Sequence, residues 1–91
     1  MVRPRLGRMI RRDPAVTYYK PQGVPLRLLE EVELSHEEWE VLRLRHVEGL
    51  EQLDAAAAMN TSQSTLQRLL ASAQKKVGRA IVQGMAIRIV K

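Results

Sequence analysis

The chain has 91 residues, of which 45% are hydrophobic, with no cysteine, one tryptophan and a formal net charge of +5. This length allows one small domain, and the absence of cysteine excludes a disulfide scaffold, thiolate catalysis and thiolate zinc sites. No apolar run reaches the roughly 18 residues of a membrane helix, and the start lacks the apolar stretch of a signal peptide. We therefore expect a soluble, cytoplasmic protein.

Charge is unevenly distributed along the chain. Residues 1–20 carry six basic groups and one acid, residues 21–50 carry seven glutamates, and no acidic residue follows Asp54 although six basic residues do. A basic start and a basic C-terminal half favour a polyanion such as nucleic acid as the partner. The alternative is a set of solvated faces that keep a small protein soluble.

Residues 1–33 contain all four prolines and are predicted to form an extended basic arm with a turn at residues 20–23 and one short strand in "VTYY". The arm can follow the phosphate backbone of DNA or enter its minor groove. Alternatively, the arginines of the arm pair with the glutamates at 30, 31 and 33 and touch no nucleic acid. The arginines that this alternative involves are Arg8, Arg11 and Arg12.

A first helix is predicted over residues 36–47. Ser35 and Glu38 form a capping box, and Gly49 ends the helix. Apolar side chains occupy two nearly opposite sides of this helix, Trp39 on one and Val41 on the other, which is typical of a helix wedged between two surfaces. One surface is expected to be the following helices, and the other the arm or another subunit.

A short helix over residues 51–59 and a long helix ending near residue 83, before Gly84, follow in the sequence. Between them Asn60 is predicted to take positive φ. Ser62, or alternatively Thr61, is predicted to cap the long helix. Gly78 weakens the long helix and is interpreted as a close contact. This spacing is that of a helix-turn-helix, although similar helical hairpins occur in domains that bind no DNA.

The outer face of the long helix is the candidate surface for reading base edges in the major groove. The residues predicted to read bases are Ser62, Gln63, Ser64, Gln67 and Arg68. The residues predicted to contact the DNA backbone are Arg3, Arg5, Arg8, Gln52, Thr65, Lys75 and Lys76. For Arg68 the alternative is a structural role in which it pairs with a nearby acid.

The last segment, "MAIRIVK" at residues 85–91, alternates β-branched residues. It is too short to stand alone as a strand and is predicted to pair with "VTYY", within the chain or across a dimer. The alternative is a frayed tail that continues the helix.

Residues 34–82, from "LSHEEWEVLRL" through "AAAAMNTSQSTLQRLL" to "KKVGRAIV", resemble the helix-turn-helix of sigma-factor region 4. The whole chain resembles domain-of-unknown-function family 134, through "RPR", "VTYYKPQGVPL", "LSHEEWEVLRL" and the terminal "GMAIRI". The resemblance implies DNA binding. Two departures stand out: Asn60 stands where glycine is usual, and the short helix at residues 51–59 opens with "EQLD" where a polar capping residue and paired acids are typical. We expect the turn to persist and that helix start to be less firmly held.

These observations predict a mainly α fold: a three-helix core with a helix-turn-helix like sigma region 4, an extended N-terminal arm rich in proline and arginine, and a short β pairing of the termini. One domain is expected, made of the arm (1–33), the helical segment (34–84) and the tail (85–91). The predicted function is a double-stranded DNA-binding transcriptional regulator, as a homodimer. The alternative is a protein-interaction module that docks on the transcription machinery, such as RNA polymerase, through Leu70, Val77 and Ile81. RNA binding is a third option.

Enzymatic and metal-binding functions have little support in the sequence. His36 and His46 stand ten residues apart without a His-Glu motif, and no glycine loop for phosphate or catalytic triad is present. We therefore predict no enzyme activity, no metal site and no cofactor.

Overall fold

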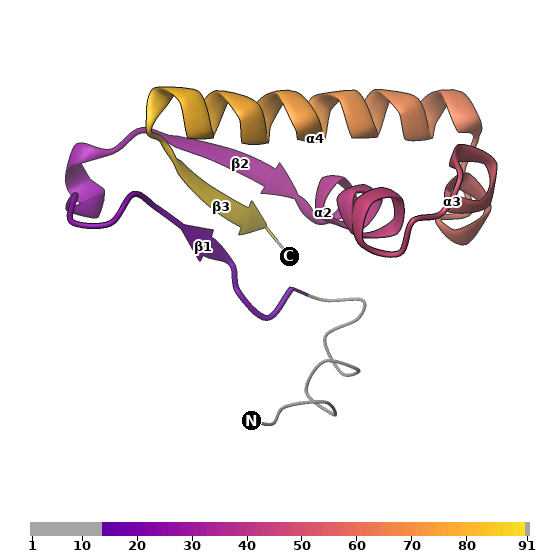
Figure 1. Ribbon diagram of the computed structural model, residues 1–91, viewed down its shortest axis with the longest axis horizontal. Coiled ribbons are helices and arrows are strands. Elements are labelled where there is room, and N and C mark those ends of the chain that lie inside the picture. The colour runs from indigo at the N-terminus through magenta and orange to yellow at the C-terminus, as the bar shows by residue number, and fades with distance from the viewer. Residues whose placement is uncertain (1–13, 91) are drawn as a thin grey trace.

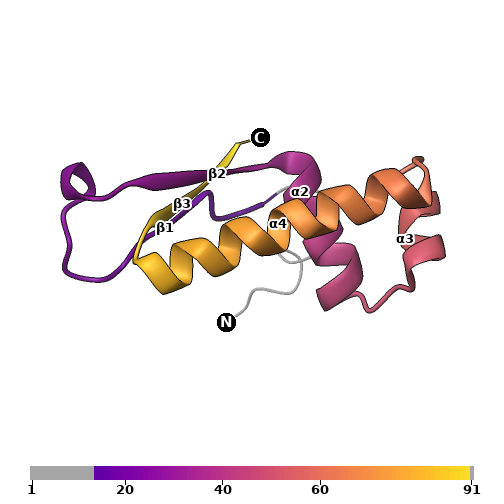
Figure 2. The same ribbon diagram turned by 90° about the horizontal axis from the view of Figure 1, so that it is seen from above.

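The computed structural model describes residues 14–90, and this part of the chain forms three α-helices and a three-stranded sheet (Figure 1). In chain order the elements are β1 (Tyr18–Tyr19), a short 3-10 helix η1 (Leu26–Leu28), β2 (Glu31–Ser35), α2 (His36–Leu42), its π-helical continuation η2 (Arg43–Val47), α3 (Gln52–Ala58), α4 (Gln63–Gln83) and β3 (Ala86–Val90). The mainly helical character agrees with the prediction. Seen from above, α4 lies over the other elements, and none of them covers its upper surface (Figure 2).

The first helix has the predicted bounds and caps. The Ser35 hydroxyl accepts a hydrogen bond from the Glu38 amide at 3.1 Å, and the Glu38 carboxylate accepts one from the Ser35 amide at 2.8 Å. The last turn widens into a π-helix, in which the Glu48 amide donates to the carbonyl of Arg43 at 2.8 Å. Gly49 then takes a φ of 76°, a conformation that glycine adopts without steric cost, and ends the helix.

The turn between α3 and α4 also forms as predicted. Asn60 has a φ of 56°, and the Thr61 amide donates to the carbonyl of Ala56 at 2.9 Å, so the turn persists without glycine. Ser62, and not Thr61, caps α4 by accepting from the Thr65 amide at 3.1 Å. The start of α3 has no side-chain cap, because Glu51 at the N-cap position makes no such hydrogen bond.

The long helix runs unbroken to Gln83, and Gly84 ends it in a left-handed conformation with a φ of 68°. Gly78 lies within α4, and a side chain built at this position would meet nothing within 4 Å. The interpretation of Gly78 as a close contact is therefore wrong for the part of the chain that the structure describes. The glycine faces open space.

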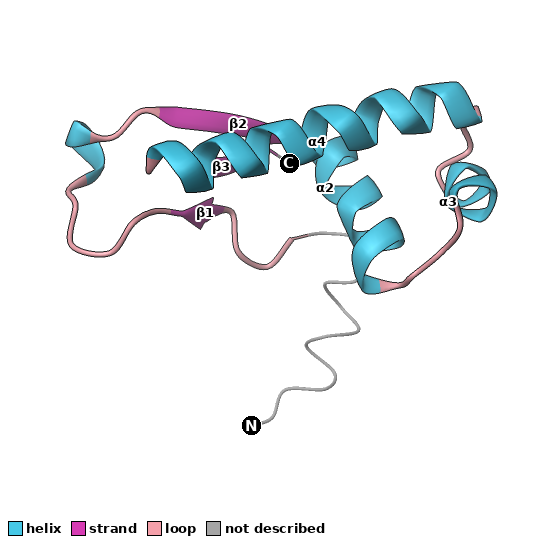
Figure 3. Ribbon diagram, turned by 45° about the horizontal axis from the view of Figure 1, so that its top comes forward, coloured by secondary structure: helices cyan, strands magenta, loops and turns pink. Residues whose placement is uncertain are grey.

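The sheet confirms one prediction and adds a strand that the sequence analysis missed. β3 pairs with β1 within the chain, antiparallel, with Tyr18 opposite Arg88. β3 also pairs with β2, in parallel, from Glu31 opposite Ala86 to Ser35 opposite Val90. β3 is therefore the middle strand of the sheet, between β2 and β1 (Figure 1). Figure 3 shows α4 passing in front of this sheet. β2 spans the predicted boundary between residues 33 and 34. The three predicted segments, 1–33, 34–84 and 85–91, therefore each contribute residues to one sheet.

The main core lies where α2, α3, α4 and the sheet meet. Leu66 of α4 and Val41 of α2 are its largest fully buried side chains. The alanines of α3 let this short helix approach closely, and Ala55 and Ala56 are buried. The core cluster comprises Leu34, Val41, Leu44, Ala55, Ala56, Leu66, Ala73 and Ile89. The other side of α2, with Trp39 and Leu42, is only partly buried. Within residues 14–90 no helix combines the length and apolar character needed to cross a membrane.

Candidate nucleic-acid interface

The outer face of α4 carries the side chains predicted to read bases. Ser64, Gln67 and Arg68 are exposed and line one shallow hollow on this face, together with Ala71. Ser62 and Gln63 are also exposed and lie at the start of the helix. The structure thus brings the five predicted residues together at the N-terminal half of α4, on the side away from the core.

Three basic side chains continue this face toward the C-terminal end. Arg68, Lys75 and Arg79 are spaced by seven and four residues, so they project from one side of the helix over about 16 Å. All three are exposed, and within residues 14–90 none of them forms an ion pair. Since α4 contains no acidic residue, its outer face presents cationic groups only. We call this set the basic stripe.

Among residues 14–90 no acid pairs with Arg68, as its alternative, structural role would require. Its guanidinium contacts the hydroxyl of Thr65 at 3.4 Å, and Thr65 in turn accepts a hydrogen bond from the Ser62 hydroxyl at 3.0 Å. Thr65 is partly buried, so its position favours a role in holding Arg68 and the helix cap. Gln52 is partly buried at the start of α3.

Lys76 differs from the other predicted backbone contacts because its charge is used inside the fold. Its ammonium donates to the Glu38 carboxylate at 2.9 Å and to the carbonyl of Glu33 at 2.7 Å. Glu38 is buried and also accepts hydrogen bonds from the Ser72 hydroxyl and the Ser35 amide. Lys76 thus joins α4 to α2 and β2.

The surroundings of Glu38 act on its ionisation in opposite directions. Burial by itself raises the pKa of the carboxyl, because a charged group loses its hydration. The hydrogen bonds from Ser72 and Ser35 and the ammonium of Lys76 outweigh this effect, so the pKa of Glu38 lies below its ordinary value. Glu38 is therefore a carboxylate at neutral pH.

Arg3, Arg5 and Arg8, predicted to contact the DNA backbone, lie outside the described residues. Arg11 and Arg12, which share with Arg8 the alternative of pairing with the glutamates at 30, 31 and 33, also lie outside the described residues. The structure does bear on those glutamates. Glu31 and Glu33 both pair with Arg88 of β3, at 3.3 Å in the case of Glu31. Two of the three acids thus already have a basic partner in the sheet.

Sequence reasoning missed Arg79 and the structural role of Arg88. Arg79 could have been found from its spacing to Arg68 and Lys75. Arg88 could not, because its partners belong to β2, which was not predicted. Within residues 14–90 no three His, Cys, Asp or Glu side chains gather as metal ligands. His46 lies 3.0 Å from the amide nitrogen of Gln74, and His36 stacks on Trp39.

Comparison with known proteins places the chain in a family. Residues 1–91 match the family model described as "Protein of unknown function DUF134". The chain belongs to this family. A UPF0251 protein of Dehalococcoides mccartyi is 54% identical over 89 residues, which cover 98% of this chain and 76% of that protein. A UPF0251 protein of Caldanaerobacter subterraneus subsp. tengcongensis is 48% identical over 89 residues, covering 98% and 75%.

A third relative, a UPF0251 protein of Moorella thermoacetica, is 53% identical over 89 residues, which cover 98% of this chain and 60% of the relative. No solved structure matches the chain at a significant level. The geometry of α4 is therefore the basis for a functional proposal.

Proposed function

We propose that the protein binds double-stranded DNA, with α4 in the major groove, and regulates transcription. The observation that carries this proposal is the outer face of α4, which is exposed, carries Gln67, Arg68 and Lys75, and has no acidic residue. The major groove of B-DNA admits one α-helix, and its base edges accept or donate hydrogen bonds to Gln, Arg and Ser side chains. The resemblance to sigma-factor region 4 supports the same assignment.

The two halves of this face have different roles in the proposal. Gln63, Gln67 and Arg68 stand at the N-terminal half of α4, which is the part of a recognition helix that meets base edges. Lys75 and Arg79 lie about two and three turns beyond Arg68 and neutralise phosphates. The cap at Ser62 and the packing of Ala55 and Ala56 fix the start of α4.

Selection of bound sequences from a random pool of DNA duplexes, at stated salt, tests the proposal. On the best selected site, Arg68→Ala is expected to weaken binding by about 1 to 3 kcal/mol and to relax the preference at one position. Lys75→Ala is the matched comparison. It is expected to weaken binding to all duplexes alike and to flatten the slope of log affinity against log salt by about one.

Two results would count against this function. If the folded protein enriches no sequence and binds no duplex at low salt, α4 does not contact DNA. If binding persists but Arg68→Ala leaves the sequence preference unchanged, Arg68 does not read bases.

A second candidate, docking on the transcription machinery, is favoured by one observation on the flank of α4. Ile81 is 72% exposed there, and Leu70 and Val77 are only partly buried. This flank is separate from the basic stripe. If Ile81→Glu removes binding to RNA polymerase while Arg68→Ala does not, the second candidate would be supported.

A further inference from the structure

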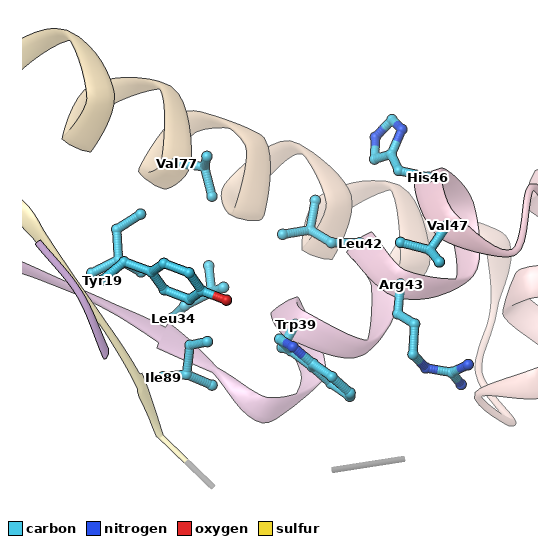
Figure 4. A pocket seen from close by; sticks show the side chains of 10 residues that line it. Tyr19, Leu34, Trp39, Leu42, Arg43, His46, Val47, Val77 and Ile89 are labelled. Atoms are coloured by element: carbon cyan, nitrogen blue, oxygen red, sulfur yellow. The ribbon is translucent and has the colours of Figure 1, made fainter. Parts of the chain in front are cut away.

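Two hollows on different sides of α4 differ in the groups that line them. The hollow beneath α4 lies between the sheet and α2, and Tyr19, Leu42 and Val77 point toward one another across it (Figure 4). The hollow on the outer face combines apolar side chains with groups that form hydrogen bonds, and we call it the outer hollow. It is lined by Ser64, Gln67, Arg68, Leu70, Ala71 and Gln74.

Ala71 forms the floor of the outer hollow, because its side chain is a single methyl group among longer ones. Successive residues of an α-helix are about 100° apart, so Ala71 lies about 40° from Gln67 on one side and about 60° from Arg68 on the other. Helical side chains lean toward the N-terminus of the helix, and Gln67 and Arg68 precede Ala71 by one turn. The methyl group is therefore directed at the space between an amide and a guanidinium.

These three side chains are available to a ligand. All three are exposed, and among residues 14–90 the amide of Gln67 has no hydrogen-bond partner. The guanidinium of Arg68 contacts the hydroxyl of Thr65 at the long distance of 3.4 Å. Leu70 differs from them, because it is half-buried and packs against the main core. Ala71 thus supplies the accessible apolar surface of the outer hollow.

The edges of base pairs in the major groove offer a partner for each of these groups. A guanidinium pairs with O6 and N7 of guanine, and a glutamine amide with N6 and N7 of adenine. The apolar group that base edges present there is the C5-methyl of thymine, which an alanine side chain can contact. Neighbouring bases are about 3.4 Å apart along a strand, and one helical turn rises about 5.4 Å. Ala71 therefore faces the same base pair as Arg68 or a neighbouring one.

We infer that Ala71 reads the C5-methyl group of a thymine at or beside the base pair that Arg68 contacts. This reading role rests on the proposed DNA binding and names a chemical group that the site recognises in its ligand. The ligand is then duplex DNA that carries a 5-methylpyrimidine at one position. RNA does not qualify, because uracil lacks the methyl group and the A-form major groove is too narrow for side chains to read.

Removal of the methyl group alone tests the inference. On the best site selected from the random pool, each thymine is replaced in turn by deoxyuridine, which keeps the hydrogen-bonding groups of thymine. At one position, at or next to the one where Arg68→Ala relaxes the preference, uracil is expected to weaken binding about threefold to fivefold, the effect of one buried methyl group. At the other positions uracil should leave the affinity unchanged.

Ala71→Gly removes the methyl group on the protein side and should bind the thymine and uracil duplexes equally at this position. Ala57→Gly is the matched control, because Ala57 is also an exposed helical alanine but lies in α3, outside the outer hollow. It should keep the preference for thymine. Glycine lowers helix stability at both positions, but the ratio of the two affinities does not depend on the fraction of folded protein. Circular dichroism checks that both variants fold.

Cytosine and 5-methylcytosine at the same position show whether the methyl group belongs to thymine. The 5-methylcytosine duplex should bind more tightly than the cytosine duplex, because it restores the methyl group, and less tightly than the thymine duplex that was selected. If the 5-methylcytosine duplex binds the most tightly, the assignment to thymine is wrong and methylated DNA is the ligand.

The possible failures of this inference and of the proposed function are distinguishable. If uracil weakens binding at no position, Ala71 reads no methyl group, while DNA binding stands. An equal preference for thymine in Ala71→Gly and Ala57→Gly would overturn the inference as well, because another residue then contacts the methyl group. A protein that selects no duplex contradicts both, and this result appears in the selection before any thymine is replaced.

Discussion

Lys75 and Lys76 are neighbours on α4 and have opposite surroundings. Lys75 is exposed on the outer face and forms no ion pair with any residue between 14 and 90. Lys76 lies on the inner side, where its ammonium is held by Glu38 and by the carbonyl of Glu33. The same chemical group thus stabilises the fold on one face of the helix and is available to a ligand on the other. The position of the lysine around the helix axis, and not its residue type, decides between these two roles.

The substitution expected to have the largest effect on stability is at Glu38, whose carboxylate binds Lys76 on the inner side of α4. Glu38→Ala removes one half of the capping box and leaves Lys76 and Ser72 without their shared partner. We expect a loss of about 2 to 4 kcal/mol in the free energy of unfolding, measured with urea. Glu37→Ala, at the exposed position next to it, is the control and should change this free energy by less than about 0.5 kcal/mol. Equal effects of the two substitutions would contradict the role of Glu38.

Lowering the pH should weaken the contacts that Glu38 makes with Lys76 and Ser72. Because the pKa of Glu38 in the folded protein lies below its ordinary value of 4.5, ionised Glu38 contributes stability that is complete above about pH 4.5 and is lost as the pH falls through the lowered pKa. The stability advantage of the unmodified chain over Glu38→Gln, measured by urea unfolding from about pH 7 to about pH 3, should be constant at first and shrink at the acid end. An advantage that grows on acidification would be inconsistent with the lowered pKa.

Substitution of the two lysines is expected to change stability by less than substitution of Glu38. The two lysine variants compare the inner and outer faces of α4 directly. Lys76→Met should lower the free energy of unfolding by about 1 to 2 kcal/mol, because buried Glu38 loses an ionic partner. Lys75→Met should change it by less than about 0.5 kcal/mol and should weaken DNA binding instead. Urea unfolding and duplex titration of both variants make the comparison. It fails if both variants lose the same stability.

The caps and turns could be predicted from the sequence because each depends on a few adjacent residues. Ser35 and Glu38 satisfy each other's backbone groups three residues apart, and Asn60 and Gly84 supply the left-handed conformations that end two helices. The pairing of the last segment with "VTYY" was also predicted, from alternation and from the need of a short strand for a partner.

The strand β2 could not be predicted with the same ease. Its alternation is present, since Val32 and Leu34 are buried while Glu31 and Glu33 are exposed. However, glutamate is a poor strand former, and no local feature indicates that these residues pair in parallel with a segment near the end of the chain. The structural role of Lys76 could not be predicted for the same reason. Its ammonium contacts β2 as well as α2, and the position of β2 was not known from the sequence.

The position of β3 has a consequence for how the protein is made. A ribosome synthesises the chain from its N-terminus, so β1 and β2 emerge before β3. β3 lies between them in the sheet and pairs with both. The contacts within α2, α3 and α4 are closer in sequence and can form while synthesis continues, but the sheet must wait for residues 86–90. Until then Val32 and Leu34 lack the strand beside them, and the nascent chain exposes two unpaired strand edges.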